Sequence, residues 1–192
     1  MTDAGDWSLR VLPVEQAPLL TGPAEGTGSV VFRYDGPPML LTLRRTSSDD
    51  GSLTAHALNH PVGKKTLIAN TGGRRRPATG PVWVAEDGSC FVIVSATDRT
   101  SWRIEPQSLD AVPVLGKRIK GHGYGVVRHT GPESEMLLTH ESVGLADMLI
   151  IFELDERLFP LRRVSTASGL EWLPSGYLQI RSIGKWEIEN RG

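Results

Sequence analysis

Two glycine-rich stretches of this 192-residue chain contain the residue types of a phosphate-binding loop. Gly26–Pro37 reads GTGSVVFRYDGP, and Gly121–Pro132 reads GHGYGVVRHTGP. A nucleotide-binding glycine loop follows a strand and opens a helix, whose N-terminus faces the phosphate. Both stretches here run into apolar residues typical of strands, and neither ends in the GK[ST] of a P-loop. We therefore expect glycines that let the chain turn tightly into a first strand, and we expect no cofactor.

Histidine and cysteine could bind a metal only at short, fixed spacings. His56 and His60 are four residues apart, but on a strand that separation is about 13 Å. The single cysteine, Cys90, excludes an internal disulfide and lies in the apolar run CFVIV, which indicates a buried, unreactive side chain. The histidines are His56, His60, His122, His129 and His140. The sequence predicts no metal site.

Acidic pairs could support hydrolysis, and Asp49–Asp50 and Asp155–Glu156 are the candidates. Both pairs fall in predicted turns, where solvated carboxylates are the ordinary outcome. No G-x-S-x-G stretch surrounds a serine. We expect no catalytic residues, although an enzyme of unknown type remains an alternative because catalytic groups can converge from distant loops.

Three adjacent arginines, Arg74, Arg75 and Arg76, form the strongest charge feature, in the loop GGRRRPATG. They are either a solvated loop or a contact for an anionic partner, since they concentrate positive potential. Arg44 and Arg45 belong to the same half, but on a strand they point to opposite faces. The formal net charge of the chain is -1, which makes nucleic acid an unlikely partner.

The two glycine stretches are also copies of one another. They align without a gap at an offset of 95 residues, and six positions are identical: Gly26/Gly121, Gly28/Gly123, Val31/Val126, Arg33/Arg128, Gly36/Gly131 and Pro37/Pro132. At the same offset upstream lie the pairs Trp7/Trp102, Pro18/Pro113 and Leu20/Leu115. Downstream, LTAHALN resembles LIIFELD, GPVWV resembles GLEWL, and SWRIE resembles KWEIE. We infer an internal duplication, with a first module at 1–105 and a second at 106–192, of which 106–120 is the linker and first strand.

Short apolar runs bounded by glycine, proline, aspartate and asparagine predict strands in both halves. No window keeps a helical apolar stripe over three turns. Gly144–Phe159 comes closest, but its β-branched and aromatic residues favour a strand. We therefore predict an all-β chain of two tandem, jelly-roll-like β-sandwich modules. The core anchors expected in them are Trp83, Trp102, Trp172 and Trp186.

This order of motifs resembles a β-sandwich module common in actinobacterial proteins, often in extracellular or lipoprotein chains. The module's pattern runs G-x-G-x-x-V, a T-H-x-G-like strand, F-x-V-x-x-L, L-L-V-N-T-x-G and a terminal W-x-I. The first half matches through GTGSVVFRYDGP, LTAHALN, TLIANTGG and SWRIE, and the second through GHGYGVVRHTGP, MLLTHESVG, LIIFELD and KWEIE. The second half lacks an L-L-V-N-T equivalent. The resemblance implies a binding or scaffolding role, usually a secreted one, and brings no catalytic residues to this chain.

The leading hypothesis is thus a non-enzymatic protein that binds another protein, with a homo-oligomer as one form. The alternative is a carbohydrate-binding module in which exposed aromatic rings stack on sugars, the candidates being Trp7, Tyr34, Tyr124 and Trp172. Exposure of these rings separates the two hypotheses. The start MTDAGDWSLRVLP has no features of a signal peptide, and the apolar runs are too short to span a bilayer. We expect a cytoplasmic chain, or an extracellular one if a leader has been removed.

Overall fold

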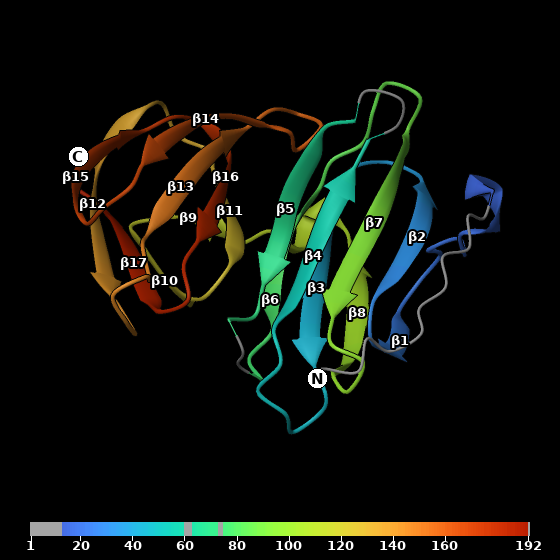
Figure 1. Cartoon of the computed structure of the whole chain (residues 1–192). Helices are drawn as coiled ribbons and strands as arrows, with labels where there is room; N and C mark the ends of the chain where they lie inside the picture. The colour runs from blue at the N-terminus through green and yellow to red at the C-terminus, as the bar shows by residue number, and fades with distance from the viewer. Residues whose placement is uncertain (1–12, 60–62, 73–74, 192) are drawn as a thin grey trace.

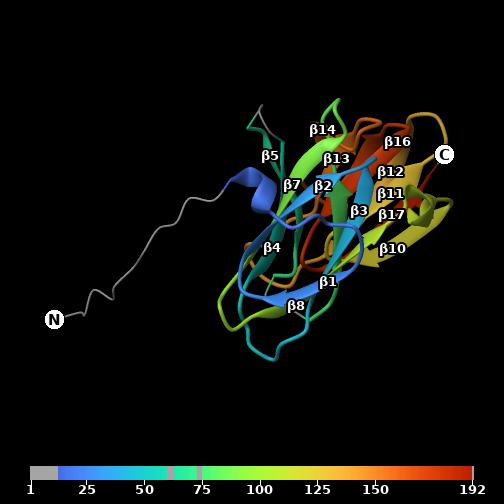
Figure 2. The same cartoon turned by 90° about the vertical axis from the view of Figure 1, so that its right-hand side faces the viewer.

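Two β-sandwiches lie side by side in the computed structural model, which describes residues 13–59, 63–72 and 75–191 (Figures 1 and 2). The short 3-10 helix η2 (Leu109–Ala111) follows the last strand of the first sandwich, and η1 (Val14–Gln16) precedes the first strand. The predicted all-β fold of two tandem sandwiches is confirmed.

The first sandwich packs the sheet β1-β8-β3-β6 against the sheet β2-β7-β4-β5. Its strands are β1 (Ala24–Thr27), β2 (Val30–Asp35), β3 (Met39–Arg45), β4 (Leu53–Leu58), β5 (Lys65–Asn70), β6 (Ala78–Val82), β7 (Ser89–Ala96) and β8 (Ser101–Gln107). All strand pairs in the two sheets are antiparallel.

The second sandwich packs the sheet β10-β17-β12-β15 against the sheet β14-β13-β16-β11-β9. Its strands are β9 (Val114–Leu115), β10 (Arg118–His122), β11 (Gly125–His129), β12 (Ser134–Glu141), β13 (Ile150–Leu154), β14 (Pro160–Ser165), β15 (Gly169–Leu173), β16 (Gly176–Arg181) and β17 (Lys185–Asn190). The segment Gly144–Phe159, the nearest approach to a helix in the sequence, contains strand β13 as expected.

The two sandwiches have the same strand order. Each of β10 to β17 takes the place that β1 to β8, in the same succession, take in the first sandwich. The segments that precede the two sandwiches also make equivalent backbone hydrogen bonds. The N–H of Arg33 donates to the carbonyl of Pro18, and the N–H of Arg128 donates to the carbonyl of Pro113, both at 2.9 Å. The shared order agrees with the aligned motifs, while a duplicated origin and the 105/106 boundary stay predictions.

The paired glycines explain the repeated motif. Gly26 lies opposite Trp102 across β1 and β8, and a Cβ on Gly26 would lie 2.6 Å from the indole ring. Gly121 and Trp186 are paired in the same way across β10 and β17. Gly26 and Gly121 therefore lie within strands, rather than in a turn ahead of the first strand. No strand was expected at β1, whereas β10 begins inside 106–120, where a linker and first strand were expected.

Three of the four tryptophans expected in the cores are there: Trp83, Trp102 and Trp186 are buried. The expectation for Trp172 is wrong, because 61% of this residue is exposed. The sequence alignment of GPVWV with GLEWL matches Trp83 with Trp172, but these two residues are not equivalent in the structure. Strand pairing shows that Pro81 is the residue equivalent to Trp172. Pro81 lies opposite Leu40 on β3, and Trp172 lies opposite Glu135 on β12.

The first sandwich meets the second along its β5–β6 side (Figure 1). One apolar cluster joins first-sandwich residues to Val126, Leu154 and Leu158 of the second. Gln179 of β16 is fully buried, and its side-chain amide donates to the carbonyls of Leu67 (3.2 Å) and Ile68 (3.1 Å) on β5. The second sandwich therefore covers two edge strands of the first, which would otherwise present unpaired backbone groups.

Candidate functional site

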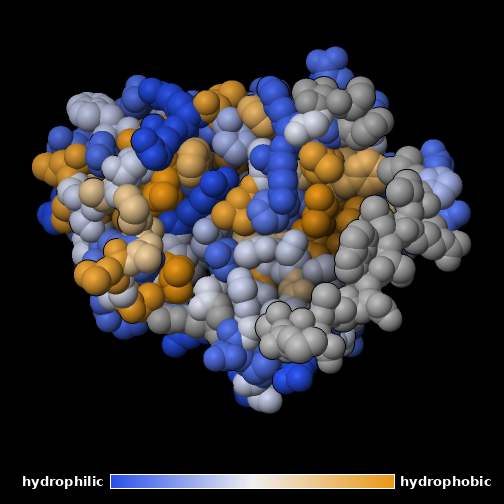
Figure 3. All heavy atoms as spheres, viewed as in Figure 1, coloured by the Kyte–Doolittle hydropathy of each residue, from blue (hydrophilic) through white to orange (hydrophobic). Residues whose placement is uncertain are grey.

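Exposed apolar side chains are concentrated on the second sandwich. Among the described residues, nine large apolar side chains are exposed, and seven belong to it. Three of these lie on β14 and β15, which are neighbouring edge strands of the two facing sheets: Leu161 (57% exposed), Leu170 (57%) and Trp172 (61%). We call Leu161, Leu170 and Trp172 the β14–β15 surface. Figure 3 shows apolar residues on the flank where β15 lies in Figure 1.

Strand alternation explains why two of these residues are exposed. On β15, Leu173 is buried in the core, so Leu170 and Trp172 point to the outer face of their sheet. Leu170 is paired with Leu137 of β12, and Trp172 with Glu135. The apolar residues thus form a small group at one edge of the sheet.

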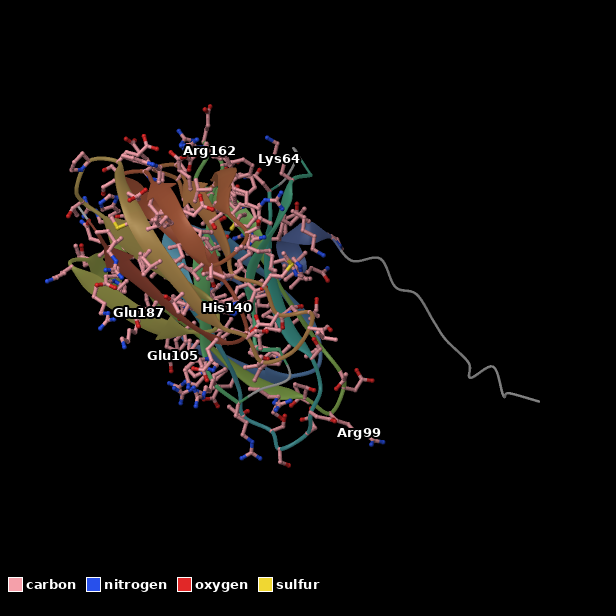
Figure 4. The ribbon with its side chains drawn as sticks, turned by 90° about the vertical axis from the view of Figure 1, so that its left-hand side faces the viewer. Lys64, Arg99, Glu105, His140, Arg162 and Glu187 are labelled. Carbon is pink, nitrogen blue, oxygen red and sulfur yellow. The ribbon has the colours of Figure 1, made fainter. Side chains whose placement is uncertain are left out.

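Charged residues cover the rest of this sheet face, which Figure 4 views with Glu187 labelled. Glu187 forms ion pairs with Arg118 and Lys120, the latter at 3.0 Å. Glu189 pairs with Arg191 at 3.3 Å. The hydrogen bonds and charges of these cations lower the pKa of Glu187 against a smaller opposing effect of burial, with the Lys120 hydrogen bond contributing most. An apolar centre beside satisfied ion pairs has the composition of a protein interface core with a polar rim.

In the first sandwich the equivalent edge strand, β6, is covered by the second sandwich. The positions equivalent to Leu170 and Leu137 hold Thr79 and Thr42, whose hydroxyls are hydrogen bonded at 2.9 Å. The backbone N–H of Thr79 donates to the carbonyl of Tyr124 in the second sandwich. In the second sandwich the corresponding edge carries apolar side chains, and no described segment covers them.

The loop between β12 and β13 presents a second group of exposed apolar residues, namely Val143, Leu145 and Met148. A buried carboxylate holds this loop. Asp147 accepts hydrogen bonds from the backbone N–H groups of Ile183 (2.8 Å) and Val143 (3.1 Å). Burial alone would raise the pKa of Asp147, but these two hydrogen bonds, with help from His140 and Ser182, lower it.

Asp147, His140 and Ser182 bring together the three residue types of a nucleophilic triad. In a working triad the hydroxyl and the carboxylate bind opposite nitrogens of the imidazole. Here Nε2 of His140 lies 3.0 Å from the hydroxyl of Ser182 and 3.2 Å from the carboxylate of Asp147. All three side chains are buried. This arrangement tethers a loop and does not prepare a serine for attack. Figure 4 labels His140 on its strand.

The arginine loop is partly described. Arg75 and Arg76 are exposed, whereas Arg74 lies outside the described residues. Arg44 is exposed and Arg45 is buried, with its Nη1 donating to the carbonyl of Gly51 at 3.0 Å, so these two point to opposite faces as expected. The two interpretations of the loop, solvated or bound to an anion, both stay predictions.

The three described residues among the predicted sugar-stacking aromatics do not lie on one surface. Trp7 falls outside the described residues, and Tyr34 and Tyr124 are half-buried on different sandwiches. The hydroxyl of Tyr34 donates to the carbonyl of Pro37 at 2.7 Å, and burial raises its pKa. Of the four candidates, Trp172 alone is shown to be exposed.

The cysteine and the histidines singled out in the sequence show no arrangement for chemistry among the described residues. Cys90 is buried, which raises the pKa of its thiol to about 12 with smaller contributions from Asp35 and Asp87. Nδ1 of the buried His129 lies 2.9 Å from the carbonyl of Pro174. Burial lowers the pKa of His56, and His60 lies outside the described residues. Within the described ranges, no group of three His, Cys, Asp or Glu residues could hold a metal ion.

No family model matches the chain, and no curated protein matches it. Within the described part of the chain, no helix is long and apolar enough to cross a membrane. The β14–β15 surface was not identified from the sequence. The repeat contained a relevant difference, because threonine in the first half is replaced by leucine at Leu137 and Leu170 in the second.

Proposed function

We propose that this is a non-enzymatic binding protein that docks a protein partner on the β14–β15 surface. The position of this surface in the repeated fold supports the proposal. The β5–β6 side of the first sandwich is covered by the second sandwich, and the equivalent side of the second sandwich exposes Leu161, Leu170 and Trp172. A partner seated there would bury these side chains as the first interface buries its own.

The residue types suit this role. Tryptophan is enriched among residues that dominate binding energy at protein interfaces, and grouped exposed apolar side chains commonly indicate an interaction site. Among the described strands, each of β14 and β15 pairs with one neighbour in its sheet, so each also presents a strand edge to a partner strand.

The existing interface between the sandwiches indicates the chemistry of the partner. There, a sheet face supplies apolar residues and the side-chain amide of Gln179, which donates to edge carbonyls. We expect the partner to present a β-sheet face or edge with similar donors, either on another β-protein or on a second copy of this chain.

The test compares Trp172→Glu with a matched control, Val114→Glu. Val114 is also exposed, but it lies on β9, at the opposite edge of the sheet that contains β14. The partner is captured from cells that express the protein natively, purified and titrated by calorimetry; sedimentation measures self-association. We expect the Trp172 variant to bind at least about 30-fold more weakly, as for a residue that dominates an interface, and the control to bind normally. Equal affinities of the two variants would contradict the proposal.

Carbohydrate binding is the second candidate because the exposed ring of Trp172 lies on a sheet face opposite the carboxylate of Glu135. A flat, exposed ring beside a hydrogen-bond acceptor can stack on a sugar. Oligosaccharides that quench the fluorescence of the wild-type protein, but not of Trp172→Ala, would favour this candidate over a protein partner.

A further inference from the structure

A cavity of about 480 Å³ opens where the two sandwiches meet. Its wall combines the residue directly after β4, the residue directly before β5, the turn that follows β6, and the turn between β13 and β14. The lining residues include Asn59, Lys64, Trp83 and Phe159. A volume of this size is typical of small-molecule sites, which often lie between domains.

Two buried polar side chains on this wall lack partners. Asn59 is 1% exposed, and neither its amide nitrogen nor its amide oxygen has a hydrogen-bond partner among the described residues. Trp83 is 7% exposed, and its indole Nε1–H has no partner there either. Leaving such groups unpaired costs free energy, so their presence together on one cavity wall calls for an explanation.

Aromatic rings and charged side chains, with Lys64 and Arg157 as the cations, also line the wall. The rings of Trp83 and Phe159 meet edge to face, with centroids 4.8 Å apart. Nζ of Lys64 lies 4.9 Å from the centroid of Phe159, and Figure 4 shows Lys64 at one end of the molecule. The acidic residues are engaged locally, because Asp155 accepts from the backbone N–H of Phe159, Asp87 accepts from that of Ser89, and Glu86 forms an ion pair with Arg157 at 3.9 Å.

The turn that carries Phe159 has a strained backbone. Leu158 has a φ of 64°, the left-handed conformation that a bulky side chain rarely adopts, and its side chain is fully buried in the shared apolar cluster. Such strain occurs at sites where the surrounding structure fixes a geometry for function. Here it fixes the position of Phe159 beside Trp83.

We propose that this cavity binds a small, planar, uncharged heterocycle of the nucleobase or cyclic-amide type. The unpaired polar atoms are buried behind the cavity surface, so a ligand reaches them only when the wall opens. The amide of Asn59 then offers a donor and an acceptor side by side, which complement an edge with adjacent acceptor and donor groups, as in adenine. Trp83 and Phe159 provide rings for packing against a flat ligand. This inference is independent of the β14–β15 surface.

The first test uses adenine and uracil as probes, with benzene as a planar control that cannot form hydrogen bonds. Heteronuclear NMR follows the indole N–H of Trp83, assigned with Trp83→Phe, and the side-chain amide of Asn59. We expect saturable shifts of both signals with at least one base and none with benzene. The absence of saturable shifts with both bases would overturn the proposal.

The second test replaces Asn59 with leucine, which has a similar size and no polar atoms. Because the amide is unpaired in the free protein, Asn59→Leu should raise the melting temperature by about 2–4 °C and weaken base binding at least about 10-fold. Asn70→Leu is the control, since Oδ1 of Asn70 accepts from the backbone N–H of Gly72 at 2.8 Å and its loss should lower the melting temperature.

Two outcomes of this test would contradict the proposal. If Asn59→Leu lowers the melting temperature as Asn70→Leu does, then the amide supports the fold and is not reserved for a ligand. If Asn59→Leu binds the base as the wild type does, then the amide does not recognise it. Trp83→Phe keeps a ring and removes only the indole donor, so it provides a folded variant for the binding measurement, and we expect it to bind the base more weakly.

Discussion

The repeated glycines and tryptophans determine how each sandwich closes. Nε1 of Trp102 donates to the carbonyl of Gly28 at 2.7 Å, and Nε1 of Trp186 donates to that of Gly123 at 2.9 Å. Gly28 and Gly123 both have a φ of 72°, the left-handed region that glycine adopts without strain. The motif that resembles a phosphate loop in sequence is therefore a seat for a buried indole.

Gly121→Ala tests this role. The added Cβ would overlap the ring of Trp186, so we expect the variant to lose about 1–3 kcal/mol of unfolding free energy, as overpacked cores do. Gly116→Ala is the control because no heavy atom lies within 4 Å of the position that its Cβ would take. Urea unfolding measures both, and equal midpoints for the two variants would contradict the packing argument.

Several residue roles follow from sequence patterns, and others do not. The alternation of Val92 and Val94 with Phe91 and Ile93 separates the buried side chains of β7 from the half-buried ones. The contact between His140 and Ser182 could not be predicted, because it joins residues 42 apart in sequence through a tertiary fold. Propensity describes the local chain and contains no information on such pairs.

At the scale of elements, the positions of most strands follow from apolar runs between turns, but register and edges do not. Strand β1 was missed, and the end of β10 was not expected, because glycines interrupt their pattern. The glycines are required by tryptophans on partner strands. The equivalence of β6 and β15 was misjudged by two residues because residue type, rather than pairing, set the alignment.

Edge strands also explain the interface between the sandwiches. Nε2 of Gln179 donates to the carbonyls of Leu67 and Ile68, and its Oε1 accepts from Nη2 of Arg181 at 2.9 Å. Gln179→Leu should lower the unfolding free energy by about 1–3 kcal/mol, since it leaves buried polar groups with fewer partners. Gln107→Leu, at the half-buried end of β8, should have a smaller effect.

Denaturant unfolding by two probes checks this prediction. Because one apolar cluster joins the two sandwiches, we expect tryptophan fluorescence and circular dichroism to report a single transition in the wild type and in both variants. An unchanged midpoint for Gln179→Leu, or two separate transitions in the wild type, would show that the sandwiches do not depend on each other.

At the scale of the whole molecule, the two sandwiches are alike in topology and unlike in surface. Val114 and its equivalent Leu19 are exposed in both, so this exposure is common to the two halves. Leu170 and Trp172 differ, since their equivalents are Thr79, which is half-buried, and Pro81, which is buried. The open side of the second sandwich is where a further partner can join the pair.

Docking on the β14–β15 surface is tested most directly by hydrogen exchange of the protein, alone and with the partner that wild type captures and Trp172→Glu does not. We predict slower exchange over residues 160–173, which include β14 and β15, and unchanged exchange in β2 and β7. Unchanged exchange over 160–173, with protection elsewhere on the molecule, would contradict docking on the β14–β15 surface.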